Sequence, residues 1–351
     1  MSDIKPKKYT YFIGIDVSKN ELDYSVMHGK KLLFHKEGKN EPLDIITFVE
    51  ELKRLPNFVM TKAVFCMENT GFYCNHLLNS LKKFKANIVC EHAMKIKNSL
   101  GLIRDKNDKI DSIRIAQYAY THREDLNLFT PKRPLIVQLA NLSTLRSRLL
   151  SVQLALQNPL SEQIEFTKKG LQAQSIKLSK STTNALANDI EEIDTVINTL
   201  IDNDAELKRL TQLITSVHNV GKITAIQIII STNEFRDINN PKKFACYAGV
   251  APFKNESGRI SSKAKTSHIA NKKVKGLLHM CAMSAVTRKG EFQDYYFRKT
   301  KIEGKPRMAV INAVRNKLIL RIFACVNQNR AYEKIYERPS KEQLQREVVT
   351  I

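Results

Sequence analysis

The sequence predicts a two-domain α/β protein whose first part carries a mixed sheet and whose second part is mainly helical. Alternating apolar residues near the N-terminus predict strands, and helix-like and strand-like segments then alternate to about residue 125. Beyond residue 133 the apolar residues follow helical spacing over long stretches. With 351 residues, of which 42% are hydrophobic, the chain can form two separate cores.

The first part, residues 1–130, is expected to begin with an antiparallel meander over residues 10–35. The turns of this meander are signalled by Lys19-Asn20 and Gly29-Lys30. Further along, apolar spacing predicts helices over 44–55, 71–84 and 106–122, and strands over 61–71 and 86–92. Three antiparallel strands followed by alternating helices and strands are typical of an α/β domain.

The middle of the chain, residues 131–209, is expected to form a helical connector. Apolar stripes of this length are typical of a helical hairpin or of a dimerising coiled coil. We expect helix breaks near Asn158-Pro159 and in the Ser- and Thr-rich residues 177–184. A mainly helical domain should then follow over residues 210–330, with residues 331–351 as a C-terminal tail.

The segment LITSVHNVGKITAIQIII, residues 213–230, predicts two helices joined by a turn at Val220-Gly221. A helix-hairpin-helix-like element of this kind would aim backbone N–H groups at a phosphate. The alternative is an ordinary connection between two packed helices. The basic surroundings favour contact with a nucleic acid.

The charge of the chain is strongly basic and unevenly distributed. It carries 57 Lys and Arg against 35 Asp and Glu, a net charge of +22. Residues 241–310 alone contain sixteen basic and four acidic residues, so more than half of the excess lies in one-fifth of the chain. This concentration predicts a surface that binds a polyanion, with nucleic acid favoured over a membrane.

The chain contains no run of 18 apolar residues, and its N-terminal residues lack a signal-peptide core. We therefore expect a cytoplasmic protein without a membrane partner. The six cysteines form no Cys-x-x-Cys pair. They are interpreted as reduced core thiols rather than as a zinc site or a disulfide framework.

Four acidic residues stand at informative places. Asp16 and Glu68 end predicted strands, and Asp108 and Asp111 lie three residues apart near the start of a predicted helix. If they converge at one sheet edge, their repulsion requires divalent cations, and Mg²⁺ or Mn²⁺ in pairs suit phosphodiester chemistry. Taken singly, each acid has an ordinary alternative as a turn residue, a cap or a solvated helix start.

Three segments, FIGIDVSK (12–19), AVFCMENTG (63–71) and KNDKIDSIRIAQYA (106–119), resemble in order and spacing the DEDD motif of the insertion-sequence 110 family of transposases. These transposases are recombinases guided by a bridge RNA. The stretch from HNVGKITA through FACYAGVAPFKNESGRISSK looks like the second domain of that family. The resemblance covers roughly residues 10–125 and 210–325. The DEDD pattern alone is shared with RuvC-like Holliday-junction nucleases.

The resemblance implies a RuvC-like, RNase H-type fold for the first domain and a DNA transposase activity. It implies that Asp16, Glu68, Asp108 and Asp111 bind Mg²⁺ or Mn²⁺, two ions at each site. It further implies a serine nucleophile at Ser257 in NESG, after the motif GVAP, that forms a 5′-phosphoserine link with DNA. Structured guide RNA, donor and target DNA, and a homodimer or homotetramer in a prokaryotic nucleoid are the implied partners and setting.

Several alternatives remain beside this reading. Ser261 and Ser262 are rival nucleophiles, and HNVG replaces the Pro-Gly-Ile-Gly that is common in the family. A RuvC-like endonuclease that uses water, or a binding protein without chemistry, would not need Ser257. Seven basic residues near the serine are expected to contact nucleic-acid phosphates: Lys254, Arg259, Lys263, Lys265, Lys272, Lys273 and Lys275.

Overall fold

The computed structural model describes residues 9–99, 107–162, 166–257, 260–267 and 269–333, and within the segment 254–263 only the backbone. The chain divides into two compact units, residues 1–131 and 132–351, which are described separately. The predicted boundaries of a connector at 131–209 and a further domain at 210–330 remain predictions. The tail at 334–351 lies outside the described residues.

The first unit is built on one five-stranded sheet with the strand order β3-β2-β1-β4-β5. β1 pairs antiparallel with β2, and β2 with β3, so the predicted meander is confirmed. β4 runs parallel to β1, and β5 parallel to β4. The strands are β1 (Tyr11–Val17), β2 (Glu21–His28), β3 (Lys31–Lys39), β4 (Ala63–Glu68) and β5 (Asn87–Glu91).

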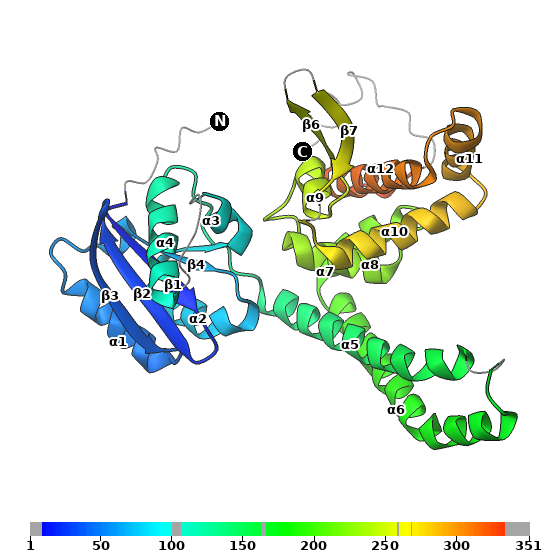
Figure 1. Ribbon diagram of the computed structural model, residues 1–351, viewed down its shortest axis with the longest axis horizontal. Helices are drawn as coiled ribbons and strands as arrows, with labels where there is room; N and C mark the ends of the chain where they lie inside the picture. Colours follow the sequence, from blue (N-terminus) through cyan, green and yellow to red (C-terminus); the bar gives the residue numbers. More distant parts are fainter. Residues whose placement is uncertain (1–8, 100–106, 163–165, 258–259, 268, 334–351) are drawn as a thin grey trace, which may run out of the picture. The chain divides into compact units, whose positions relative to one another are not determined.

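Helices cover both faces of this sheet (Figure 1). The helical segments of the unit are α1 (Pro42–Lys53), η1 (Met60–Lys62), η2 (Gly71–Cys74), α2 (Asn75–Lys83), α3 (Ala93–Ser99) and α4 (Asp108–Thr121). Alternate residues of each strand point to opposite faces. Ile13 and Ile15 of β1 therefore pack in the core shared with α1 and α2. Phe12, on the other face, packs against Ala116 of α4.

The second unit is mainly helical, as predicted. Its first two helices, α5 and α6, form a long hairpin (Figure 1). Arg146 of α5 joins Asp194 of α6 through hydrogen bonds of 2.6 and 2.8 Å. The helices are α5 (Pro134–Glu162), α6 (Lys169–Asp202), α7 (Ala205–Ser216), α8 (Lys222–Thr232), α9 (Pro241–Tyr247), α10 (Lys272–Thr287), α11 (Glu291–Phe297) and α12 (Arg307–Asn327), with a π-helical turn η3 (Arg298–Ile302).

Of the two helix breaks that we expected in this hairpin, the one near Asn158-Pro159 is confirmed a few residues later, since α5 ends at Glu162, and the one at 177–184 is wrong. Pro159 lies inside α5, near the end of that helix, and residues 177–184 lie within the unbroken α6. In α6 the hydroxyl groups of Ser175, Ser179 and Thr183 each donate to the carbonyl four residues earlier. These side chains satisfy their polar groups on the helix itself, so they do not end it.

The helical hairpin predicted for residues 213–230 is confirmed as α7, a short turn and α8. A two-stranded hairpin, β6 (Pro252–Ser257) and β7 (Ile260–Thr266), was not predicted. The core of the unit joins all the long helices and includes Phe244, Leu278 and Phe323. Within the described residues, none of the helices has the length and apolar character needed to cross a membrane.

All six cysteines are free. Cys66, Cys74, Cys281 and Cys325 are buried, as expected for core thiols, whereas Cys246 is exposed.

Candidate active site

A row of acidic residues crosses one face of the sheet in the first unit. Asp16 of β1 is directly opposite Asp23 of β2, and Glu68 of β4 is directly opposite Glu91 of β5. Ile15 pairs with Met67 in the parallel β1–β4 ladder, so Asp16 and Glu68 follow as neighbours at the carboxyl ends of their strands. Four strands therefore bring four carboxylates to one line.

The row lies on the face that α4 covers. Asp16 and Glu68 alternate with Ile15 and Met67, which point into the opposite core. The two acids therefore share a face with residues such as Cys66, which packs against α4. This is the side on which Asp108 and Asp111 begin the helix.

Close packing on β1 sets the position of α4. Gly14 has no side chain, and a Cβ there would lie 2.8 Å from the Cα of Ala116 and closer still to the Ser112 carbonyl oxygen. The buried hydroxyl groups of Ser25 and Ser112 are 2.7 Å apart. These two contacts hold the first turns of α4 over the end of β1 in one register.

The first turn of α4 is also stabilised by its own sequence. The Asn107 side chain accepts a 2.9 Å hydrogen bond from the backbone N–H of Lys109, which is an N-cap interaction. Asp108 and Asp111 in this turn are favoured by the helix dipole. Asp111 also accepts a 2.9 Å hydrogen bond from Arg114.

Asp16 lies within electrostatic reach of the other three predicted acids. Burial, and then the charges of Asp108, Asp111 and Glu68, raise the pKa of Asp16 from 3.8 to about 6. The backbone N–H of Val17 donates to Asp16 and opposes this rise. Within the described part of the chain, no cationic side chain pairs with Asp16. A half-buried carboxylate among three others is the environment that a divalent cation stabilises.

The outer acids of the row have partners of their own. Glu91 accepts hydrogen bonds of 2.5 Å from Lys95 and 3.1 Å from the Tyr118 hydroxyl. Asp23 accepts a 2.8 Å hydrogen bond from His35. These two acids were missed from the sequence. The repeated pattern of an acid near a strand end could have identified them, but the strand register was needed to align the row.

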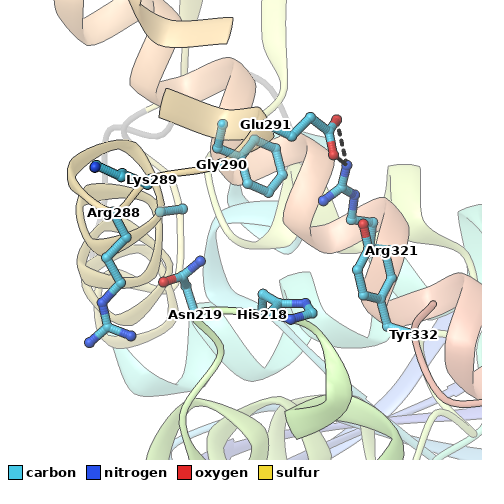
Figure 2. A pocket seen from close by; sticks show the side chains of 10 residues that line it. His218, Asn219, Arg288, Lys289, Gly290, Glu291, Arg321 and Tyr332 are labelled. Atoms are coloured by element: carbon cyan, nitrogen blue, oxygen red, sulfur yellow. Dashed lines mark hydrogen bonds and ion pairs between the residues drawn. The ribbon is translucent and has the colours of Figure 1, made fainter. Parts of the chain in front are cut away.

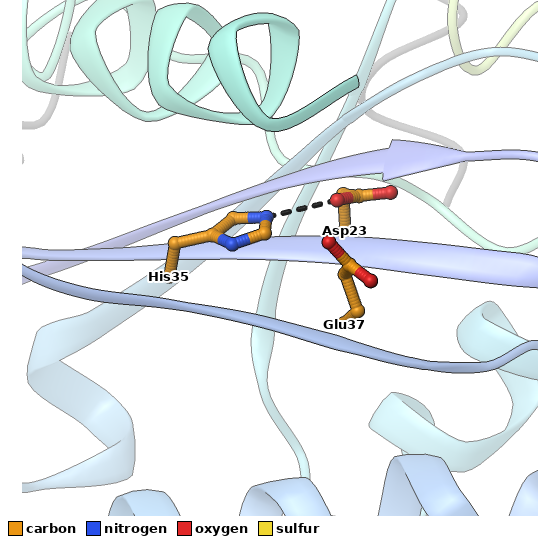
Figure 3. A group of neighbouring side chains, drawn as sticks. All are labelled: Asp23, His35 and Glu37. Carbon is orange, nitrogen blue, oxygen red and sulfur yellow. Dashed lines mark hydrogen bonds and ion pairs between the residues drawn. The ribbon is translucent and has the colours of Figure 1, made fainter. Parts of the chain in front are cut away.

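Asp23, His35 and Glu37 form a compact group on β2 and β3 (Figure 3). One ligand atom of each lies within 4.8 Å of the others, and among the described residues no other group of three meets this limit. No three of the four predicted acids therefore meet this limit. His35 already forms a hydrogen bond with Asp23. We therefore infer that this group stabilises the sheet beside the candidate site.

The proposed nucleophile lies in the second unit. Ser257 is the last residue of β6 and pairs with Ile260 of β7. The rivals Ser261 and Ser262 lie in β7, opposite Glu256 and Asn255. The side chains of all three serines lie outside the described part of the structure. The choice of Ser257 among them therefore stays a prediction.

The predicted basic residues fall into three groups. Lys265 and Lys272 are exposed, and Lys275 is half-buried. Lys273 donates to the carbonyl and hydroxyl oxygens of Ser143, at 3.3 and 3.2 Å, and so joins α10 to α5. Burial, and then the charge of Arg146, lower the pKa of Lys273. The last group lies outside the described residues or side chains: Lys254, Arg259 and Lys263.

Comparisons with known proteins agree with this arrangement. A DEDD transposase model of the IS110 group matches residues 13–168, and the model described as "Transposase IS116/IS110/IS902 family" matches residues 211–297. The pilin gene-inverting protein of Moraxella bovis is 25% identical over 240 residues, which are 67% of this chain and 70% of that protein. The pilin gene-inverting protein of Moraxella lacunata matches to the same extent.

A shorter match covers 104 residues at 25% identity, 28% of this chain, and involves 26% of an uncharacterized 44.8 kDa protein of insertion element IS116 from Streptomyces clavuligerus. The row of acidic residues on the sheet of the first unit and the two family matches together define a DNA-recombining enzyme of the DEDD transposase type. The chain belongs to the insertion-sequence 110 family of transposases.

Proposed function

We propose that this transposase is an RNA-guided recombinase that moves an insertion sequence, and that it cuts and rejoins DNA through a 5′-phosphoserine link. The observation that carries the metal part of this proposal is Asp16. This carboxylate is half-buried, its pKa is raised to about 6, and no cation of the described residues pairs with it. Hard oxygen donors at such a place fit Mg²⁺ or Mn²⁺.

In this proposal Asp16, Glu68, Asp108 and Asp111 hold two divalent cations. Bound cations would lower the pKa of an attacking hydroxyl and stabilise the charge on a leaving oxygen. The residues of the chain position these groups. β1 and β4 present two carboxylates from a rigid sheet, and α4 adds two more from a helix that Gly14 and Ser112 hold in register.

The serine chemistry follows from the family resemblance. Ser257 Oγ attacks a backbone phosphorus and forms a Ser–O–P bond, while the bond from phosphorus to the 3′ oxygen breaks. The proton of Ser257 leaves to a base or to solvent, and the departing 3′ oxygen takes up a proton. The phosphoserine link keeps a phosphodiester for rejoining, so no external energy source is needed.

The guide RNA and the oligomer are parts of the same proposal. The basic stretch 241–310 supports a large surface that binds nucleic acid. The RNA guide is inferred from the resemblance to the family. Cutting two DNA sites requires at least two active centres, so we propose a homodimer or homotetramer. The name of the pilin gene-inverting relatives suggests DNA inversion as another outcome of the same strand exchange.

We also propose that the first unit has a RuvC-like, RNase H-type fold and that the α5–α6 hairpin acts as a coiled-coil connector. The sheet of three antiparallel strands extended by two parallel strands, with acids at the strand ends, supports the first proposal. The contacts between α5 and α6 support the second.

A second candidate is a Holliday-junction-type endonuclease that uses water. The observation that favours it is that all four acids belong to the first unit. The two candidates predict different products. Only the recombinase forms a covalent bond to DNA.

The deciding experiment incubates the protein with Mg²⁺, RNA transcribed from the gene flanks and labelled junction DNA, and then separates the products on a denaturing gel. The recombinase proposal expects a protein–DNA adduct that is lost in Ser257→Ala and in Asp16→Ala. Ser261→Ala and Ser262→Ala are matched controls that should keep the adduct. Cleavage without an adduct, unchanged in Ser257→Ala, would establish the water-using nuclease instead. An adduct lost only in Ser261→Ala or Ser262→Ala would identify that serine, rather than Ser257, as the nucleophile.

A further inference from the structure

A cavity of about 240 Å³ opens in the second unit where the α7–α8 turn meets the connection between α10 and α11 (Figure 2). All the residues that line it belong to the second unit. The metal and serine chemistry proposed above does not use it, although the sequence of the α7–α8 turn in its wall predicted contact with a nucleic acid. The residues that matter for its chemistry are His218, Asn219, Arg288, Lys289, Arg321 and Tyr332.

The cavity has a surplus of positive charge. Arg288 and Lys289 are exposed in the α10–α11 connection, and within the described residues neither forms an ion pair. Arg321, in contrast, donates to both carboxylate oxygens of Glu291 at 2.7 Å and is neutralised. Two free cations at the rim of one hollow attract an anion, and a phosphate is the common anion of a nucleic acid.

The turn between α7 and α8 adds neutral donors to the same cavity. Asn219 has a φ of 68°, the left-handed conformation that Asn tolerates better than most residues. Its Oδ1 accepts a 3.2 Å hydrogen bond from the Ser284 hydroxyl. The Nδ2 group therefore has two donors without an acceptor among the described residues. Buried Val217 and Val220 anchor the turn on either side.

The remaining wall of the cavity is aromatic. The rings of His218 and Tyr332 meet edge to face, with centroids 5.6 Å apart. The Arg321 guanidinium lies 5.0 Å from the centre of the Tyr332 ring and 4.3 Å from that of Phe292. Flat apolar and guanidinium surfaces of this kind stack with nucleobases. A site for phosphate alone would not need such a wall.

We propose that this cavity binds one unpaired nucleotide of a nucleic-acid strand. Arg288, Lys289 and Asn219 contact its phosphate, and its base lies against His218 and Tyr332. The volume is below the roughly 300–1,000 Å³ of pockets for larger ligands, so the cavity holds a single base, with the phosphate at its rim, and excludes a base pair. The proposal does not depend on the serine or metal chemistry.

The test uses fluorescence anisotropy in EDTA, so that cleavage cannot interfere. The probes are short duplexes that are either fully paired or carry one bulged 2-aminopurine nucleotide, each made as DNA and as RNA. We expect the intact protein to bind at least one bulged duplex about tenfold more tightly than its paired form. We also expect quenching of the 2-aminopurine on binding. The nucleic acid that shows the preference identifies the source of the nucleotide.

The variant Arg288→Gln with Lys289→Gln should lose the preference for the bulge. The matched control, Lys301→Gln with Lys305→Gln, removes two exposed positive charges elsewhere in the unit and should keep it. His218→Leu should reduce the quenching while keeping both cations. Circular dichroism checks that the variants are folded. Equal binding of bulged and paired duplexes by the intact protein, or an equal loss in both double variants, would overturn the proposal.

Discussion

Gly14 of β1 and Ala116 of α4 are in contact so close that no side chain fits between them. A Cβ at Gly14 would lie 2.8 Å from the Ala116 Cα, and the backbone nitrogen of Ala116 is nearer still. This contact brings the acidic first turn of α4 to the end of β1, where Asp16 lies. A residue without chemistry of its own therefore controls the distance between the acids that we propose to bind metal.

The first prediction concerns this contact. Gly14→Ala should push α4 away from the sheet, because the new methyl group would meet backbone atoms that cannot rotate aside. We expect a loss of about 3 kcal/mol or more in the free energy of unfolding and a large loss of DNA cleavage. Urea denaturation and the cleavage assay measure the two effects. Gly38→Ala, whose Cβ would contact only the Tyr24 side chain at 3.4 Å, is the control and should retain activity.

The second prediction concerns the pH dependence of stability without metal. The pKa of Asp16 is raised from 3.8 to about 6, so the folded protein holds this proton more tightly than the unfolded chain. The stabilisation is complete below about pH 4 and is lost as the pH rises through about 6. Asp16→Asn, which cannot ionise, should therefore raise the thermal midpoint in EDTA at about pH 8 and change it little at about pH 4. An equal shift at both pH values would contradict the assignment.

The third prediction concerns metal binding. Asp16→Asn should weaken binding of Mn²⁺ by roughly tenfold or more. Mutation of a residue that only hydrogen bonds to a metal ligand commonly lowers metal affinity by that factor, so loss of a ligand should lower it at least as much. Isothermal titration calorimetry at neutral pH measures the affinity. Asp23→Asn, in the same row but hydrogen bonded to His35, should bind Mn²⁺ nearly as well as the intact protein. The reverse result would place the metal on Asp23, His35 and Glu37 instead.

The fourth prediction concerns the start of α5 in the second unit. Arg133 donates to both oxygens of Asp204 at 2.9 Å and to Glu234, whose side chain is only 1% exposed. Arg133→Met would leave the buried charge of Glu234 without its ion pair to residue 133. We therefore expect a loss of about 3–5 kcal/mol in the free energy of unfolding. Arg236→Met is the control, because Arg236 is exposed and lies 3.8 Å from the same carboxylate. Chemical denaturation should show a loss several times smaller for the control.

The fifth prediction concerns oligomerisation through the α5–α6 hairpin. The C-terminal half of α6 buries Ile190, Ile193 and Ile197, whereas Leu171 and Leu178 in the first half are 58% and 76% exposed. These two leucines lie seven residues apart and so share a face. Leu171→Glu with Leu178→Glu should shift the protein towards the monomer in analytical ultracentrifugation.

Gln174→Glu with Ser181→Glu adds the same charge at exposed polar positions of α6 and should leave the oligomer intact. If both double variants dissociate equally, charge repulsion rather than the apolar face explains the result. If neither dissociates, subunits associate through another surface.

Much of the fold could be predicted because its signals are local. Alternation of apolar residues identified the three strands of the meander, and helical spacing identified α1, α2 and α4. The acids Asp16, Glu68, Asp108 and Asp111 were chosen as candidates because each stands at the end of a strand or the start of a helix. The helix break near Pro159 was placed a few residues early, and the one at 177–184 was predicted wrongly. Proline near a helix end and hydroxyl groups bonded to their own helix do not interrupt it.

The sequence by itself determined which segments become strands and helices, and it identified four carboxylates and a basic stretch suited to nucleic acid. Only the tertiary structure decided which of these groups meet. Strand register brought Asp16 beside Glu68 and opposite Asp23, and the contact of Gly14 with α4 added Asp108 and Asp111. The periodicity of apolar residues shows which face of a helix or strand is buried. The register between strands and the distance between packed elements depend on partners far away in the sequence. The cavity around His218 and Arg288 arises in the same way, because its walls come from four separate segments.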